Sequence, residues 1–130
     1  MNFDPMSPIW LQVAGRIKQE IVTGQRPLGS RLPGGRDLAL DFSINPNTAA
    51  RVYRELESEE VCVTKRGLGT FVTEDGERIG ALREEMASEA TERFLKSMFA
   101  LGFSAGDAIE LIKREEEHAH AGKQGSNEEV

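Results

Sequence analysis

The chain has little cysteine, no long apolar run and few residues suited to catalysis, and each shortage excludes a class of protein. Its single cysteine, Cys62, excludes an intrachain disulfide and a zinc site built from several cysteines. No apolar run reaches the length of a membrane span, and no signal-peptide pattern opens the chain, so we expect a cytoplasmic protein without a membrane partner. Hydrophobic residues at 38% still permit a packed core.

Groups that could perform catalysis or hold a metal are also scarce. The two histidines, His118 and His120, lie two residues apart in a charged segment, which is poor metal-binding geometry on a helix. No Ser-His-Asp set or apolar carboxylate cluster is evident, and the "GLG" at 67–69 lacks the Lys-Ser/Thr of a phosphate loop. We therefore predict no enzymatic activity, no cofactor and no metal.

Basic residues are outnumbered, with 16 Lys and Arg against 22 Asp and Glu, but the excess acid is unevenly distributed. Residues 1–75 hold 9 bases and 10 acids, a net charge of −1, whereas residues 76–130 hold 7 and 12, a net charge of −5. Because local fields matter more than the total, the net charge of −6 does not exclude nucleic acid from the first part.

The stretch "INPNTAARVYRELE" (44–57) predicts a helix over 46–59 with two distinct faces. Asn45 suits the N-cap and Pro46 the first helical position. An apolar stripe at helical spacing contains Ala49, Val52, Tyr53 and Leu56. The opposite face carries Asn47, Arg51, Arg54 and Ser58. A polar helix face of this kind is either simply exposed to solvent or is a binding surface for another molecule.

The neighbouring segments favour a partner, because their order is that of a winged helix-turn-helix. Apolar spacing predicts a helix over 9–22 and a short one over 34–42, with a short strand at 30–32. A tight turn at Ser43–Ile44 leads into 46–59, and "VCVTKRGLGTFVTE" (61–74) predicts a β-hairpin. The helix over 46–59 would then lie in a DNA major groove, where Arg fits guanine or phosphate and Asn fits adenine or phosphate.

Residues 7–72 resemble the DNA-binding domain of the GntR family of bacterial transcription regulators. The resemblance lies in "GSRLPGGRDLA", "NPNT" and "KRGLGTFV". It implies a winged helix that binds an operator as a dimer. Transferred by position, the family's DNA contacts fall on Arg36, Asn47, Thr48, Arg51, Lys65, Arg66 and Gly67, to which the polar helix face adds Arg54.

Two positions depart from the family pattern. Gly34-Gly35 stands where a Ser and an apolar residue are common, which weakens the start of the helix over 34–42. Glu59-Glu60 stands where the family favours Gly after the reading helix, which leaves the end of that helix without its usual cap.

The second part of the chain predicts two helices, over 75–103 and from Ser104 to about residue 118. Ser104 and Asp107 form a variant capping box for the second of them. Two helices are too few to enclose a core or a ligand pocket of several hundred Å³, so their apolar faces must pack on a partner or on the winged domain. If the partner is a second copy of the chain, which we favour, the two helices dimerise through their apolar residues. These are Leu82, Met86, Phe94, Leu95, Met98, Phe99, Ile109 and Ile112.

Together these patterns predict a mostly α fold with a small β-hairpin: a winged helix-turn-helix domain (1–75), a two-helix dimerisation segment (76–118) and a disordered acidic tail (119–130). The short tail is similar to that of the YtrA-like subfamily of GntR regulators. That resemblance implies a homodimeric repressor of an inverted-repeat operator, with transporter genes among the candidate targets, and leaves a small-molecule effector open. The competing hypothesis is a winged-helix protein–protein interaction module, which should expose apolar anchors on the reading face.

Overall fold

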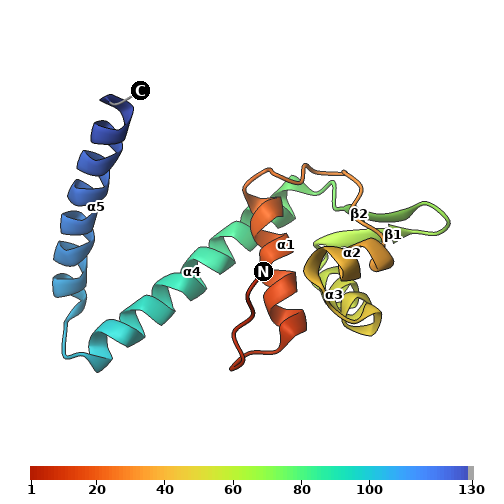
Figure 1. The fold of residues 1–130 in the computed structure, drawn as a ribbon, viewed down its shortest axis with the longest axis horizontal. Helices are drawn as coiled ribbons and strands as arrows, with labels where there is room; N and C mark the ends of the chain where they lie inside the picture. Colours follow the sequence, from red (N-terminus) through yellow and green to blue (C-terminus); the bar gives the residue numbers. More distant parts are fainter. Residues whose placement is uncertain (129–130) are drawn as a thin grey trace. The chain divides into compact units, whose positions relative to one another are not determined.

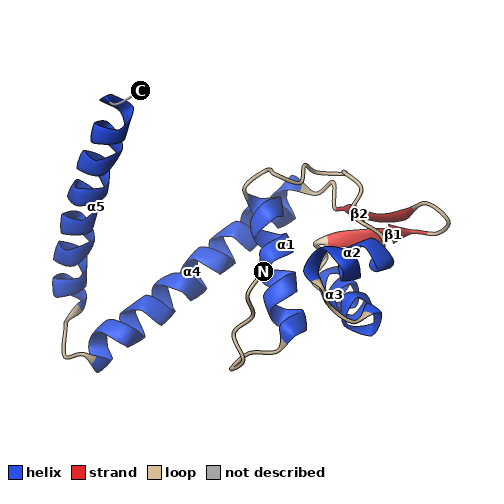
Figure 2. Ribbon diagram, viewed as in Figure 1, coloured by secondary structure: helices blue, strands red, loops and turns tan. Residues whose placement is uncertain are grey.

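The computed structural model describes the backbone of residues 1–128 and the side chains of residues 1–120, in two compact units, Met1–Glu84 and Glu85 onward (Figure 1). The elements are α1 (Ile9–Val22), α2 (Gly35–Phe42), α3 (Pro46–Ser58), β1 (Cys62–Lys65), β2 (Gly69–Val72), α4 (Gly76–Ala100) and α5 (Ala105–Glu128). The mostly helical architecture with one small hairpin, predicted from the sequence, is confirmed (Figure 2).

The first unit packs α1, α2, α3 and the hairpin around one core. In α1, residues four apart face inward, because apolar positions at this spacing share one side of a helix. The buried side chains of α1 are Val13, Ala14, Ile17 and Ile21. Helix α3 buries the stripe predicted from its sequence, Ala49, Val52, Tyr53 and Leu56. With this stripe inside, the opposite face of α3 remains in solvent.

The turn between α2 and α3 has a strained residue and a strong cap. Ser43 ends α2 with φ 55°, a left-handed conformation that non-glycine residues rarely adopt. Asn45 then starts α3, and its side-chain oxygen accepts a 2.7 Å hydrogen bond from the backbone N–H of Asn47. This is the capping interaction predicted from "NPNT", and it fixes where the reading helix begins.

The hairpin is antiparallel, with Cys62 opposite Val72 and Lys65 opposite Gly69. The short strand predicted at 30–32 forms a single bridge between Arg31 and Phe71. Two backbone bonds of 2.8 Å, from Leu32 N–H to the Thr70 carbonyl and from Val72 N–H to that of Ser30, hold this segment against β2. The hairpin is therefore anchored along one edge to the body of the unit.

The unusual Glu59-Glu60 pair is accommodated at the end of α3. Glu60 adopts φ 61°, the left-handed position that glycine fills in many helices. The N–H of Glu60 and that of Val61 still donate to the carbonyls of Glu57 and Leu56, so the last carbonyls of α3 are satisfied. Glu59 forms a 2.7 Å ion pair with Lys18 of α1, which compensates for its position at the negative end of the helix.

The first turns of α4 belong to the winged unit. Asp75 caps the helix by accepting a 3.0 Å bond from the N–H of Glu77. Ile79 and Leu82 are buried within the first unit, and the guanidinium Nε of Arg78 donates to the Glu59 carbonyl at 2.8 Å. The boundary between the units therefore falls after Glu84, later in the chain than the predicted boundary at residue 75.

The second unit consists of the rest of α4 and all of α5. Gly102, with φ 86°, reverses the chain between them. The predicted capping box is confirmed: the Ser104 N–H donates to the Asp107 carboxylate at 2.9 Å, and the Asp107 N–H donates to the Ser104 hydroxyl at 3.1 Å. The bond from the Ser104 N–H, helped by the Ser104 hydroxyl, lowers the pKa of the exposed Asp107 carboxyl.

Helix α5 runs to Glu128, whereas the sequence predicted a disordered tail from residue 119. Half of residues 119–128 are Ala, Lys, Gln or Glu, which are good helix formers, and the helix continues through them although Gly122 and Gly125 weaken it. Residues 129–130 of the predicted tail lie outside the described residues.

We predict that the winged unit loses stability in alkaline solution, because burial raises the pKa of Tyr53 to about 12. In the unfolded chain the phenol ionises near pH 10, so the contribution of Tyr53 to stability is full below pH 10 and falls by up to about 3 kcal/mol as the pH rises to 12. Burial raises the pKa of the Cys62 thiol to about 12 as well, with the same sign.

The chain has one tyrosine, so the ultraviolet absorbance of tyrosinate reports Tyr53 directly. A native titration midpoint near that of the urea-unfolded chain would contradict the prediction. In Tyr53→Phe the alkaline loss of stability should shrink to the part that comes from Cys62.

Candidate nucleic-acid interface and apolar face

Helix α3 presents a polar surface that its buried stripe leaves in solvent. Asn47, Arg51 and Arg54 are exposed and Thr48 is half-buried, as the helical spacing predicted. The pyrrolidine of Pro46 carries no N–H, so the amides of the first turn that face outward are those of Asn47 and Thr48. The Asn47 amide is used by the Asn45 cap, and the Thr48 amide donates to the Asn45 carbonyl. Side chains, more than free amides, therefore define this surface.

Arg36 lies in the first turn of α2 and is exposed. Gly34, the N-cap of α2, provides no side-chain cap, so the first turn of α2 keeps unpaired amides near this guanidinium. The predicted weakness at Gly34-Gly35 does not prevent the helix, because Leu38 and Ala39 bury its inner face. An exposed arginine at a helix N-terminus suits an anion such as phosphate.

The hairpin tip is built from Lys65, Arg66 and Gly67, all exposed. Gly67 has φ 79°, so a side chain there would strain the turn. The Nζ of Lys65 lies 4.7 Å from the centroid of the Phe71 ring, a cation–π contact across the hairpin. The tip thus carries two cations on a turn of defined shape.

Two side chains that sequence reasoning did not assign to this surface also contribute to it. Arg31 is exposed and follows the edge of the hairpin, where a Cβ on Gly69 would stand 3.0 Å from its Nε. Trp10 of α1 lies against Arg51, with the guanidinium carbon 4.3 Å from the ring centroid. Both contacts join segments distant in the sequence, so helical periodicity could not indicate them.

The second unit has a largely uncovered apolar surface. Met98 and Ala108 are its buried apolar residues among the described side chains. Phe99 is 52% exposed and Ile112 is 51% exposed. We call the exposed large apolar residues of this unit the apolar face; its members are Phe94, Phe99, Leu101, Phe103, Ile109 and Ile112. Leu101 and Phe103 are not among the residues that the sequence predicted for dimerisation.

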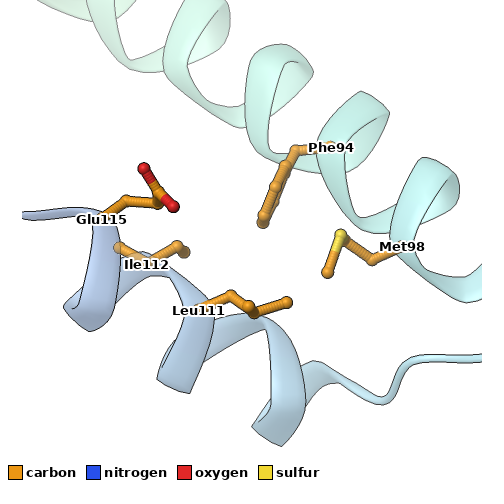
Figure 3. A pocket seen from close by; sticks show the side chains of 5 residues that line it. All are labelled: Phe94, Met98, Leu111, Ile112 and Glu115. Carbon is orange, nitrogen blue, oxygen red and sulfur yellow. The ribbon is translucent and has the colours of Figure 1, made fainter.

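A groove of about 440 Å³ lies between α4 and α5. In Figure 3, Phe94 and Met98 of α4 point toward Leu111 and Ile112 of α5, with Glu115 at one end. The groove is open along its length and does not form an enclosed pocket, so it leaves the expectation that two helices cannot enclose a cavity of several hundred Å³ in place.

Three of the residues predicted for dimerisation differ from the rest in their surroundings or their exposure. Leu82 is 2% exposed and lies in the winged unit, so its side chain is already buried in its own chain. Met86 and Leu95 are half-buried. The remaining candidates, Phe94, Met98, Phe99, Ile109 and Ile112, all belong to the second unit.

Other kinds of site are not evident in the described part of the chain. Among those residues no group of three His, Cys, Asp or Glu side chains is arranged to hold a metal ion. No described helix combines the length and apolar composition needed to cross a bilayer.

A helix-turn-helix followed by an anchored hairpin, with an exposed basic helix face, defines a winged-helix DNA-binding protein. Comparison with known proteins gives the family. Residues 10–72 match the family described as bacterial regulatory proteins, gntR family. The chain belongs to this GntR family and is a DNA-binding transcription regulator.

Individual relatives agree with this assignment over most of the chain. The HTH-type transcriptional regulator YhcF of Bacillus subtilis is 36% identical over 112 residues, covering 86% of this chain and 93% of YhcF. The transcriptional repressor YtrA of the same organism is 38% identical over 77 residues, covering 58% of this chain and 59% of YtrA. A GntR family regulator from Listeria monocytogenes has a similar structure, with 39% identity, a TM-score of 0.81 and coverage of 86% and 98%.

Proposed function

We propose that this regulator is a homodimeric repressor that binds an inverted-repeat operator, with α3 in the major groove and the hairpin on the backbone or minor groove. The observation that carries the proposal is the exposed row of Asn47, Arg51 and Arg54 on α3, in the same compact unit as the basic hairpin tip. Repression is supported by the likeness to a protein named as a repressor, YtrA.

The exposed groups divide by the part of DNA that they suit. Arg51 and Asn47 have the donors and acceptors that read guanine and adenine edges. Arg36, Thr48 and Arg54 suit phosphates, which position the helix without reading sequence. Lys65 and Arg66 extend the basic surface onto the hairpin, where Gly67 permits a close approach of the backbone.

Dimerisation is proposed to occur through the apolar face of the second unit. A unit whose large apolar side chains are mostly exposed cannot be stable by its own packing. A second copy would cover the same residues on both chains, since twofold interfaces are self-complementary. The open groove between α4 and α5 would accept apolar side chains from the partner.

The alternative, a protein–protein interaction module, has less support from this surface. Interaction surfaces depend on apolar or aromatic anchors, whereas the exposed side chains of α3 are polar, charged or small. Leu68 at the hairpin tip and Val63 of β1 are exposed, but they are small in area and neither is aromatic.

We predict that the protein selects a defined DNA sequence from a random pool. Arg51→Ala should weaken binding to that sequence by about 1–3 kcal/mol and flatten the preference at one base pair in each half-site. Arg54→Ala should weaken binding to all sequences alike, because a phosphate contact carries no sequence information. If Arg51→Ala left the selected sequence unchanged, Arg51 would not read a base.

We predict that two apolar substitutions in α4 affect different properties, one the stability of the winged unit and the other dimerisation. Leu82→Ala should destabilise the winged unit by about 2–5 kcal/mol, because it leaves a cavity in a closed core. Phe99→Ala should leave that unit stable but weaken dimerisation about tenfold or more, because the exposed ring would be covered only by a partner.

Thermal melts and sedimentation of both variants measure the two effects separately. Unchanged association in Phe99→Ala, at concentrations spanning the dissociation constant, would argue against the proposed interface.

We predict that removing residues 85–130 leaves a folded winged unit that is monomeric and binds the operator poorly. The cut falls after Glu84 because Ile79 and Leu82 are needed in the core. In the dimer the second half-site is bound as an intramolecular event, which raises affinity by about 10²–10⁴. The half-site centres should lie about one helical turn apart.

Sedimentation and DNA titration of the truncated and full-length proteins provide the measurement. A truncated protein that remains dimeric, or that binds the full operator as tightly as the intact chain, would show that the second unit has another role.

A further inference from the structure

The contact between Trp10 and Arg51 joins the first turn of α1 to the exposed face of α3. The guanidinium carbon of Arg51 lies 4.3 Å from the centroid of the indole ring. Helices α1 and α3 pack against each other, so both ends of this contact are held on rigid elements. Trp10 is half-buried and Arg51 is exposed, which places the contact at the rim of the reading surface.

We propose that Trp10 is a positioning residue for Arg51: its ring holds the guanidinium in place for DNA before DNA arrives. The inference rests on the proposed function, in which α3 reads the operator. It adds a residue from outside the helix-turn-helix to the groups that determine specificity.

The chemistry of the pair favours this role. The face of an indole ring is electron-rich and attracts a cation within about 6 Å of its centroid. A guanidinium has five N–H donors, and the ring face takes up few of them, so donors remain for a guanine edge. A long side chain that would otherwise sample several rotamers is restricted to fewer, and binding then loses less entropy.

Arg51 is distinguished in this respect from the other arginines of the surface. Among the described residues, Arg36 and Arg54 have neither an aromatic ring nor a carboxylate against their guanidinium groups. They remain free to adjust to phosphates, whose positions vary little with sequence. The single anchored arginine of α3 is therefore the one at which precise placement has the largest effect on selectivity.

The first experiment tests the contact in solution. Trp10 is the only tryptophan, so intrinsic fluorescence reports its surroundings alone. Arg51→Ala should increase the quenching of Trp10 by acrylamide, because the guanidinium no longer covers the ring, whereas Arg54→Ala should not. Equal quenching in wild type and Arg51→Ala would overturn the proposal.

The second experiment is a double-mutant cycle on the full chain with the DNA sequence selected by the wild type. Trp10→Leu should weaken binding about two- to fivefold and flatten the preference at the same base pair as Arg51→Ala. Trp10→Phe, which keeps a ring, should restore most of the lost affinity. In the Arg51→Ala background, Trp10→Leu should cost almost nothing further.

The outcomes separate this inference from the function on which it rests. If the wild type selects a sequence but Trp10→Leu costs the same with and without Arg51, the inference fails and the proposed function stands. Tighter binding by Trp10→Leu would show that the ring competes with DNA for Arg51, which also overturns the inference. If the wild type selects no sequence, the proposed function itself fails and the inference fails with it. A thermal melt of Trp10→Leu excludes loss of folding as the cause.

Discussion

The burial of one stripe of α3 is the constraint on which the rest of the molecule depends. Ala49, Val52, Tyr53 and Leu56 face the core, and their spacing leaves the opposite face of the helix in solvent. The same packing fixes α1 and α3 relative to each other, and the backbone bonds from residues 30–32 to β2 fix the hairpin edge. The basic surface is rigid because the core beneath it is closed.

A hydrogen bond from Tyr53 also stabilises this core. Its hydroxyl donates to the Pro33 carbonyl, in the segment that leads into α2. Burial raises the pKa of the phenol to about 12, so the group stays neutral and keeps its proton for that bond at physiological pH. A side chain of the reading helix thereby fixes the entry to the helix that precedes it.

Much of the winged unit could be predicted from the sequence, because its signals are local. The Asn-Pro start of α3, the apolar stripes and the Gly-containing hairpin turn each depend on a few adjacent residues. The left-handed residues Ser43 and Glu60 could not be predicted in this way, because surrounding packing imposes a conformation that neither residue prefers.

Contacts between segments far apart in the sequence could not be predicted for the same reason. Leu82 and Phe99 lie in one continuous helix and follow one apolar pattern, yet the first is buried in the winged unit and the second is exposed in the other. Periodicity reports that a face is apolar, but it does not report what covers that face. The positions of Trp10 over Arg51 and of Arg31 along the hairpin require the packing of whole elements, which no local pattern encodes.

The distribution of ion pairs explains how a chain with a net charge of −6 can present a basic surface. In the winged unit, Arg16 and Arg26 pair with Glu20, and Lys18 pairs with Glu59. These three bases share two carboxylates, Glu20 on α1 and Glu59 at the end of α3, so most of their charge is balanced within the unit.

The bases of the proposed interface have other neighbours. Arg51 and Lys65 lie against aromatic rings, which attract a cation without cancelling its charge. Glu57, an acid of α3, accepts a hydrogen bond from the Thr64 hydroxyl. Most of the acidic excess lies in the second part of the chain, since residues 76–130 carry a net charge of −5 and residues 1–75 only −1, so the local field at the reading surface can differ in sign from the net charge.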